Sequence, residues 1–338
     1  MKMNLPWIES PFFEKIIKEK NLSTEFEELA RRYNRDGFAI IKNAFTEDEI
    51  NAVKKEMDEK SFNPNFKYNS QRDDRRSQDL WFHSEPARQM SCKPEILSTL
   101  EMLYGREPVP FQTLNFRKGS QQKAHSDTIH FSSLPARFMC GVWVALEDIT
   151  EENGPLFYYP GSHKMQEYNF NDIKDDLLDN SYDNYHQYEN FMEELMEVSP
   201  YEKKVFLAKK GDALIWSSNI VHGGSPVLKE NSTRYSQVTH YFFKDCLYYS
   251  PMTSNTITGE LSLRMTLKNM ITGKEEKMSY NGKKTNLIRS FKHLYIINNH
   301  IIYPIWQRMI TDTLYIVKEF GLGKFFSLTI NRIKDKLK

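Results

Sequence analysis

The feature that most constrains the fold of this chain is a series of short strand-like segments separated by glycine and proline. The segments, rich in aromatic and β-branched residues, are 110–117, 125–131, 138–146, 156–159, 213–216 and 235–243. The residues between them that favour turns include Gly119, Pro135, Asn153-Gly154-Pro155, Pro160-Gly161 and Lys210-Gly211-Asp212. Many short strands with such punctuation favour a β-sandwich or a closed barrel.

Helical patterns accompany these strands, so we expect a mainly β fold with flanking helices. Residues 25–35 carry apolar side chains at helical spacing and end before a glycine. Thr46 and Glu49 form a capping box, which predicts a helix over residues 47–60. A further helix is expected over residues 94–104, where Gly105 closes it.

Two histidines and one aspartate could bind a metal ion together. If residues 125–131 form a strand, His125 and Asp127 point to the same face, because side chains two apart do so. His222, from a distant strand, would complete two imidazoles and one carboxylate. This set leaves positions open on an octahedral ion, as in non-haem Fe(II) oxygenases. Arg234 follows at the start of the next strand, where its guanidinium could grip a dicarboxylate.

Each of these residues also has an ordinary structural interpretation. His125 and His222 could be half-buried histidines with satisfied hydrogen bonds, and Asp127 could be a turn or cap residue. The pattern gains weight from the joint occurrence of the three candidate ligands with Arg234 and the surrounding turns. We expect the remaining strand histidines, His130 and His240, to have structural or packing roles.

The chain resembles the phytanoyl-CoA dioxygenase (PhyH) family of Fe(II)- and 2-oxoglutarate-dependent oxygenases. The resemblance spans about residues 37–243 and rests on motifs that occur in order: His125-Ser126-Asp127, Trp143-Val144-Ala145-Leu146-Glu147-Asp148, Glu152-Asn153-Gly154-Pro155-Leu156, Pro160-Gly161-Ser162-His163-Lys164, Lys210-Gly211-Asp212, His222 and Asn231-Ser232-Thr233-Arg234. It implies a double-stranded β-helix, or jelly roll, of the cupin-like type. It also implies that His163 lies in a loop that supports the barrel.

The resemblance further implies a catalytic iron centre and its cosubstrates. His125, Asp127 and His222 would be the metal ligands and the catalytic centre, and Arg234 would anchor 2-oxoglutarate. O2 would be the second cosubstrate, and ascorbate is an additional cofactor to consider. Related halogenases replace the ligand carboxylate with a small residue, so Asp127 favours hydroxylation.

Five more residues are candidates for the cosubstrate pocket. Gln112, Asn115 and Trp143 resemble positions that line this pocket in relatives. Relatives usually place a serine two residues after the distal histidine, where this chain has Gly224. Ser225 or Ser236 would have to substitute for that serine.

Charge is distributed unevenly along the chain. Of 46 Lys and Arg and 45 Asp and Glu, residues 251–338 hold 15 and 6, respectively. We therefore divide the chain into a dioxygenase domain, 1–250, and a basic extension, 251–338, with a hairpin followed by amphipathic helices. Residues 324–338 could contact an anionic membrane surface or pack on an acidic protein surface, and no recognised fold supports nucleic-acid binding.

Three widely spaced cysteines argue against a disulfide framework, and no secretory signal or membrane span is apparent. A cytoplasmic location is therefore expected, with a position peripheral to a membrane as the further option.

The sequence predicts an oxygenase that hydroxylates an unactivated C–H bond of a small organic substrate and releases succinate and CO2. The polar insert 165–204 and the loop 63–77 are expected to shape its substrate entrance. Two alternatives stay open at this point. One is a non-redox, cupin-like metal- or ligand-binding protein, which has no need of Arg234. The other is a surface-docking protein that depends on its basic tail. The identity of the substrate and the oligomeric state do not follow from the sequence.

Overall fold

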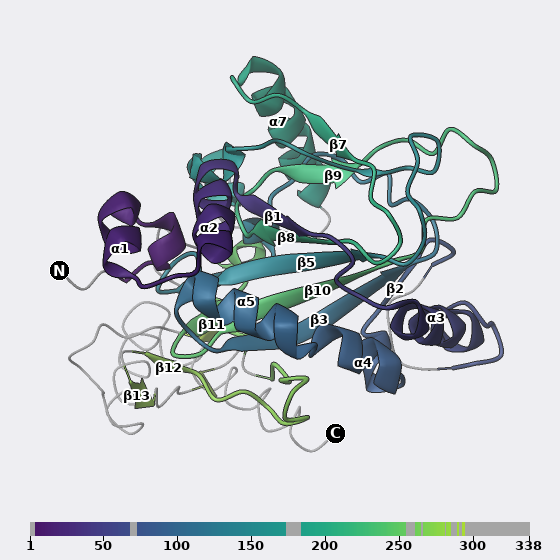
Figure 1. Ribbon diagram of the computed structural model, residues 1–338, viewed down its shortest axis with the longest axis horizontal. Helices are drawn as coiled ribbons and strands as arrows, with labels where there is room; N and C mark the ends of the chain where they lie inside the picture. The colour runs from purple at the N-terminus through teal and green to yellow at the C-terminus, as the bar shows by residue number, and fades with distance from the viewer. Residues whose placement is uncertain are drawn as a thin grey trace, which may run out of the picture. The chain divides into compact units, whose positions relative to one another are not determined.

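The computed structural model of the chain describes residues 4–67, 73–173, 184–254, 261–264, 266–280, 282–284, 289–290 and 293–294. The chain divides into two compact units, Met1–Thr285 and Asn286–Lys338 (Figure 1). In the second unit, the described residues form the short paired strands β14 (Arg289–Ser290) and β15 (His293–Leu294). The helix expected within 324–338 lies outside the described residues.

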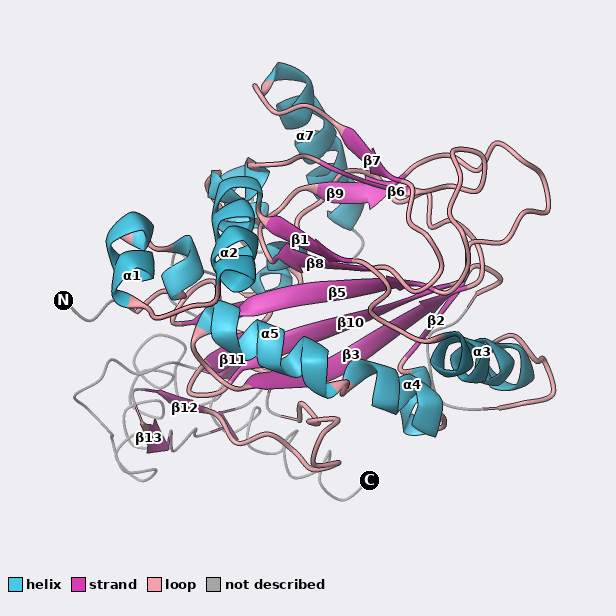
Figure 2. Cartoon of the chain, viewed as in Figure 1, coloured by secondary structure: helices cyan, strands magenta, loops and turns pink. Residues whose placement is uncertain are grey.

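Six strands form the main sheet, which crosses the centre of Figure 2. Their spatial order is β1 (Phe38–Ile41), β8 (Ala213–Ser217), β5 (Met139–Ala145), β10 (Ser236–Phe243), β3 (Pro108–Phe116) and β2 (Arg76–Gln78). Every neighbouring pair is antiparallel. Strands from distant parts of the chain therefore lie side by side, so the sheet depends on long-range pairing.

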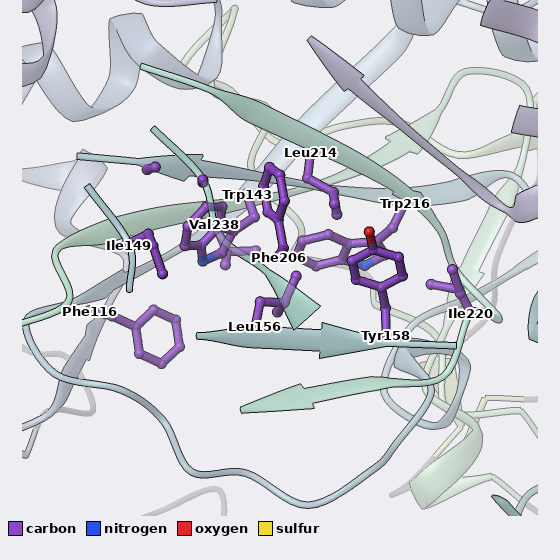
Figure 3. Packing of buried hydrophobic residues seen from close by; sticks show 12 residues of the cluster. Phe116, Trp143, Ile149, Leu156, Tyr158, Phe206, Leu214, Trp216, Ile220 and Val238 are labelled. Atoms are coloured by element: carbon purple, nitrogen blue, oxygen red, sulfur yellow. The ribbon is translucent and has the colours of Figure 1, made fainter. Parts of the chain in front are cut away.

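A smaller sheet faces the main one. It has the order β7 (Lys204–Phe206), β6 (Leu156–Tyr158) and β9 (His222–Gly224), and a separate pair joins β11 (Leu247–Tyr249) to β4 (Ser132–Leu134). Buried apolar side chains from the two facing sheets form one core (Figure 3), including Trp143, Leu214, Trp216, Leu156, Tyr158 and Phe206. Two antiparallel sheets around a shared core form the predicted jelly roll.

Two helices, α4 (Glu85–Ser91) and α5 (Pro94–Tyr104), cover the outer face of the main sheet (Figure 2). Gln237 Nε2 of β10 donates to the Ala87 carbonyl oxygen of α4 at 3.0 Å, and the Tyr241 hydroxyl donates to that of Ser91 at 2.8 Å. Because side chains alternate along a strand, Ser236, Val238 and His240 point to the inner face instead.

The predicted N-terminal helices are confirmed. Helix α2 (Thr24–Asp36) ends at Gly37, whose φ of 82° is favourable for glycine. Helix α3 (Glu47–Glu56) begins with the capping box of Thr46 and Glu49, and a π-helical turn, Met57–Ser61, continues it. Helix α5 ends at Gly105 as expected. The sequence did not indicate α1 (Phe13–Glu19) or α4. Among the described residues, the short 3-10 turns are Trp7–Glu9, Leu80–Phe82, Asp127–Ile129, Ser162–Lys164 and Pro251–Thr253.

The polar insert 165–204 contains the short helix α6 (Phe170–Ile173) and the longer helix α7 (Tyr185–Val198). The Tyr188 hydroxyl accepts a hydrogen bond from the backbone N–H of Ser126 at 3.3 Å. Tyr185 lies against the ring of His130, with centroids 4.8 Å apart. Helix α7 therefore packs directly on the segment that carries two of the predicted metal ligands.

The strand expected over residues 125–131 is wrong. The structure has a single bridge between His125 and His222, followed by the 3-10 turn η4 (Asp127–Ile129). The Ser126 hydroxyl accepts the backbone N–H of Thr128 at 3.2 Å and so caps this turn. Local capping by a serine side chain competes with strand pairing, which explains the difference.

The first compact unit extends beyond the boundary at residue 250 that the charge pattern suggested. Leu263 and Met270 are buried, and the Met270 backbone N–H donates to the Pro110 carbonyl oxygen of β3 at 2.9 Å. Strands β12 (Ser279–Tyr280) and β13 (Lys283–Lys284) form a hairpin in this segment. Among the described residues, no helix is both long enough and apolar enough to cross a membrane.

Candidate metal centre and cofactor pocket

His125 and His222 are held together by their own backbones. Each donates its N–H to the carbonyl oxygen of the other, at 3.0 and 2.9 Å, and their ring centroids are 4.4 Å apart. The Nδ1 atoms lie 2.9 Å from the Lys123 carbonyl oxygen and 3.1 Å from that of Ile220, respectively. A carbonyl only accepts, so both Nδ1 atoms are protonated donors. A ring that donates through Nδ1 in its neutral form has its lone pair on Nε2, as metal binding requires.

Asp127 completes a compact, buried cluster with these histidines. One ligand atom from each of the three residues lies within 4.8 Å of the other two. Asp127 Oδ1 is 4.0 Å from His125 Nε2 and 3.9 Å from His222 Nε2. The Trp216 indole N–H donates to the other oxygen, Oδ2, at 2.7 Å. This hydrogen bond orients the carboxylate and leaves Oδ1 directed at the histidines.

The charge states of this cluster suit a divalent cation. Burial, followed by the proximity of His222, lowers the pKa of His125 to about 3, so its ring is neutral at pH 7. Burial opposes ionisation of Asp127, but the nearby His222, His240 and His125 outweigh it and lower the pKa of Asp127 to about 2. Two imidazoles and one carboxylate are a donor set typical of non-haem Fe(II).

These ligands open into a cavity of about 370 Å³ between the two sheets. Gln112, Trp143 and Arg234 also line it, from β3, β5 and the start of β10. Figure 3 shows Trp143 and Trp216 within the core, and both residues also line this cavity. Side chains far apart in the sequence therefore meet at one site.

Arg234 is buried in the cavity wall, with 2% of its surface exposed. Its Nη1 donates to Ser236 Oγ at 3.3 Å. Within the described part of the chain, its Nε has no hydrogen-bond partner, and neither has the buried indole nitrogen of Trp143. Burial lowers the pKa of Arg234 to about 10, which leaves the guanidinium charged at neutral pH. Among the described residues, no carboxylate lies within ion-pair distance of it. A buried guanidinium with unused donors fits a carboxylate ligand.

Some of the other predicted pocket residues line the cavity, and some do not. Gln112 and Trp143 line the cavity, and Ser236 bonds to Arg234. Asn115 does not reach the cavity, because it points to the outer face of β3 and donates to Gln237 Oε1 at 2.8 Å. Asn115 is three residues from Gln112 on β3, so the two side chains point to opposite faces of the sheet. The prediction that both line the pocket is therefore wrong for Asn115. Ser225 is also absent from the cavity wall, and its backbone N–H pairs with Pro155 instead.

Two cavity residues were missed as functional candidates by sequence reasoning. His240 lies with Nε2 3.7 Å from Asp127 Oδ2. The sequence feature that could have indicated His240 is its separation of six residues from Arg234. Along an extended chain, an even separation places both side chains on the same face. Arg264 lines the cavity from the chain after β11, and no sequence pattern linked it to the site. His163 lies outside the cavity wall, where its Nε2 pairs with the Asn34 carbonyl oxygen at 3.1 Å.

The sequence profile of the phytanoyl-CoA dioxygenase (PhyH) family matches residues 33–234, which include all three clustered ligands and Arg234. The chain belongs to the phytanoyl-CoA dioxygenase family. It is 24% identical over 253 residues to the peroxisomal phytanoyl-CoA dioxygenase of Rattus norvegicus, covering 66% of this chain and 70% of that protein. It is 32% identical over 80 residues to the phytanoyl-CoA dioxygenase domain-containing protein 1 of Danio rerio, covering 22% of this chain and only 28% of that protein.

Solved structures with the same fold belong to the Fe(II)- and 2-oxoglutarate-dependent oxygenases. The family member is similar to the α-ketoglutarate-dependent epimerase SnoN from nogalamycin biosynthesis, with a TM-score of 0.52, 17% identity, and coverage of 80% of this chain and 98% of that one. EctD from S. alaskensis, solved with 2-oxoglutarate and 5-hydroxyectoine, gives a TM-score of 0.53 at 18% identity, covering 72% and 83%. At these identities the likeness establishes the fold.

Proposed function

We propose that this family member is an Fe(II)- and 2-oxoglutarate-dependent dioxygenase that hydroxylates an unactivated C–H bond of a small organic substrate. One observation carries the proposal. The buried Arg234, with an unpaired Nε–H, opens into the same cavity as His125, Asp127 and His222. A cation left without a counter-ion in the protein interior is unfavourable, and a dicarboxylate bound beside the metal would neutralise it.

The roles of the residues follow from their hydrogen bonds. His125 and His222 would bind Fe(II) through Nε2, and Asp127 through Oδ1, because their other polar atoms are already engaged. Arg234 would hold the distal carboxylate of 2-oxoglutarate, with Ser236 orienting the guanidinium and the Trp143 indole N–H as a further donor. With iron, 2-oxoglutarate and O2 bound, such a centre supplies oxidative decarboxylation coupled to oxidation of the substrate.

Hydroxylation converts R–H, O2 and 2-oxoglutarate into R–OH, succinate and CO2. One oxygen atom enters the substrate and the other enters succinate. Asp127 supports this outcome over halogenation, because its carboxylate fills the ligand position that a halide would need. Solved structures of similar fold include an epimerase and a carbocyclase, so product analysis is needed to distinguish hydroxylation from those outcomes.

The alternative is a non-redox, cupin-like protein that binds a metal or a ligand. Such a protein has no need of a buried guanidinium beside the metal. A cytoplasmic location and peripheral membrane contact through residues 324–338 are further proposals, for which fractionation and liposome binding are the measurements.

The test is anaerobic titration of the full chain with Fe(II) and then 2-oxoglutarate, followed by O2. We expect a charge-transfer absorption when 2-oxoglutarate chelates the iron, and succinate after O2 is admitted. His222→Ala should remove both signals, whereas the exposed His186→Ala should retain them. Iron binding without charge transfer or succinate would support the cupin-like alternative.

A further inference from the structure

Arg264 is fixed at the cavity by strand-like hydrogen bonds. Its backbone N–H donates to the Tyr248 carbonyl oxygen at 2.8 Å, and the Ser250 N–H donates to that of Ser262 at 3.0 Å. An antiparallel bridge between Tyr249 and Leu263 places this segment alongside β11. This segment lies beyond residues 33–234, the part of the chain that the family profile matches.

Most N–H donors of the Arg264 guanidinium have no acceptor among the described residues. It lies over two aromatic rings, with its central carbon 4.7 Å from the Phe131 centroid and 5.6 Å from that of Phe111. Its one hydrogen bond among the described residues is a long one, 3.5 Å from Nη1 to the His130 carbonyl oxygen. Within the described part of the chain, no carboxylate lies within 4.0 Å of its nitrogens. Stacking fixes the plane of a guanidinium and leaves its edge available for an oxyanion.

Asp79, the carboxylate whose charge influences Arg264, already has other hydrogen-bond partners. Its oxygens accept from the Trp81 indole N–H at 3.2 Å, the Gln78 amide at 3.1 Å and the Thr113 backbone N–H at 3.2 Å. Burial lowers the pKa of Arg264 to about 10 while Asp79 opposes this shift, so the arginine stays charged near neutral pH. Asp79 therefore influences Arg264 from a distance without occupying its donors.

Two more polar side chains line the cavity together with Arg264. Arg76 of β2 and Gln112 of β3 line it together with Arg264, and neither side chain has a hydrogen bond or ion pair within the described residues. A neighbouring cavity of about 330 Å³ shares Arg264 and Gln112 and adds Lys268. Arg76, Arg264 and Lys268 thus line these two cavities on one side. The two carboxylates among the lining residues are Asp127 and Asp79, and each already accepts a hydrogen bond from an indole N–H.

Arg264 and Arg234 mark opposite ends of strand β10. Arg234 precedes the first residue of β10, whereas Arg264 stacks on Phe111, whose ring packs on Phe242 near the end of that strand at 4.5 Å. The eight residue-to-residue steps from 234 to 242 span roughly 27 Å of extended backbone. His240, beside Asp127, belongs to the same strand between them. The metal centre therefore lies between two separate cationic groups.

We propose that Arg264, assisted by Arg76 and Gln112, binds an anionic group of the substrate, a carboxylate or a phosphate ester. This inference rests on the proposed function, in which Arg234 is occupied by 2-oxoglutarate. Binding of the substrate anion at the opposite end orients the remainder of the molecule toward the metal. The substrate class is therefore a small organic acid or a phosphorylated compound, in place of a neutral molecule.

The experiment uses the full chain loaded anaerobically with Fe(II) and saturating 2-oxoglutarate, which blocks Arg234. Hexanoate, hexyl phosphate and the neutral hexanamide are titrated by calorimetry. We expect at least one anionic probe to bind about tenfold or more tightly than hexanamide, because charge-assisted hydrogen bonds form with the guanidinium. The stronger of the two anions distinguishes a carboxylate from a phosphate ester.

Arg264→Gln should abolish this preference, Arg264→Lys should retain part of it, and the exposed Arg32→Gln should leave it intact. The affinity for 2-oxoglutarate should change less than about twofold in all three variants, which shows that each is folded. Equal binding of all probes, or a preference that survives Arg264→Gln, would overturn the inference alone. If 2-oxoglutarate itself does not bind the wild-type protein, the proposed function fails as well.

Discussion

Buried polar side chains on the two faces of strand β10 differ in their hydrogen bonding. On the outer face, Gln237 is fully engaged, since Oε1 accepts from Asn115 and Nε2 donates to Ala87 O and Ser91 Oγ. On the inner face, His240 Nδ1 and the Nε of Arg234, which lies two residues before β10, have no hydrogen-bond partner among the described residues. An unpaired buried polar group costs about 1–3 kcal/mol.

Adjacent residues of one strand can therefore serve stability and binding separately. The outer face joins the sheet to helix α4 through side chains that satisfy one another. The inner face carries groups whose best partners would come from a ligand. The following predictions test whether substitutions on the two faces have separable effects.

The largest effect is expected for Asp127→Ala. Loss of a direct metal ligand should lower Fe(II) affinity by more than the roughly 10–100-fold typical of changes to the groups that orient ligands. Equilibrium dialysis with Fe(II) measures this loss. Asp148→Ala, which removes an exposed carboxylate outside the cavity, is the control and should bind normally. Equal affinity of wild type and Asp127→Ala would contradict the assignment of the metal site.

Acid should destabilise the metal-free protein through its buried histidines. Burial lowers the pKa of His130, His163 and His240 to about 4, against about 6.5 in an unfolded chain. Between these values the unfolded state binds more protons, so stability falls as the pH drops from about 6.5 towards 4. We expect a loss of several kcal/mol between pH 7 and pH 5 in urea unfolding. An unfolding free energy that does not change over this range would contradict it.

Arg234→Gln should weaken 2-oxoglutarate binding by about 10–100-fold, because charge-assisted hydrogen bonds contribute roughly 1.5–3 kcal/mol. Calorimetry on the Fe(II)-loaded protein measures the change. The unfolding free energy should not fall, since the substitution removes a buried charge that lacks a counter-ion among the described residues. A variant with normal 2-oxoglutarate affinity but lower stability would make Arg234 a structural residue.

Trp216→Phe should lower metal affinity by about 10–100-fold, because it removes the hydrogen bond that orients Asp127. Trp81→Phe is a matched control, since that indole also bonds to a carboxylate, Asp79, outside the metal cluster. If the two variants lose affinity equally, the effect comes from packing and the positioning role is refuted.

Gln237→Leu is expected to have the smallest effect on binding. It should lower the unfolding free energy by about 1–3 kcal/mol by leaving its outer-face partners unpaired. Affinity for 2-oxoglutarate should stay within about twofold of wild type. A loss of 2-oxoglutarate affinity comparable to that of Arg234→Gln would erase the distinction between the two faces.

Local sequence signals determined much of the fold and the identity of the metal ligands. The capping box at Thr46 and the glycines at 37 and 105 fixed helix ends, because these depend on backbone conformation within a few residues. His125, Asp127 and His222 could be named because few residue types bind iron and their motif resembles that of a known family.

Only the tertiary structure decided how these side chains meet. His125 and Asp127 converge through a serine-capped turn in place of the expected strand. Asn115 does not reach the cavity, because its side chain lies on the outer face of β3. His240 and Arg264 join the site because strand register and a distant segment bring them there. Register and long-range packing depend on contacts between residues far apart in the chain, and no local pattern encodes which buried donor is left without a partner.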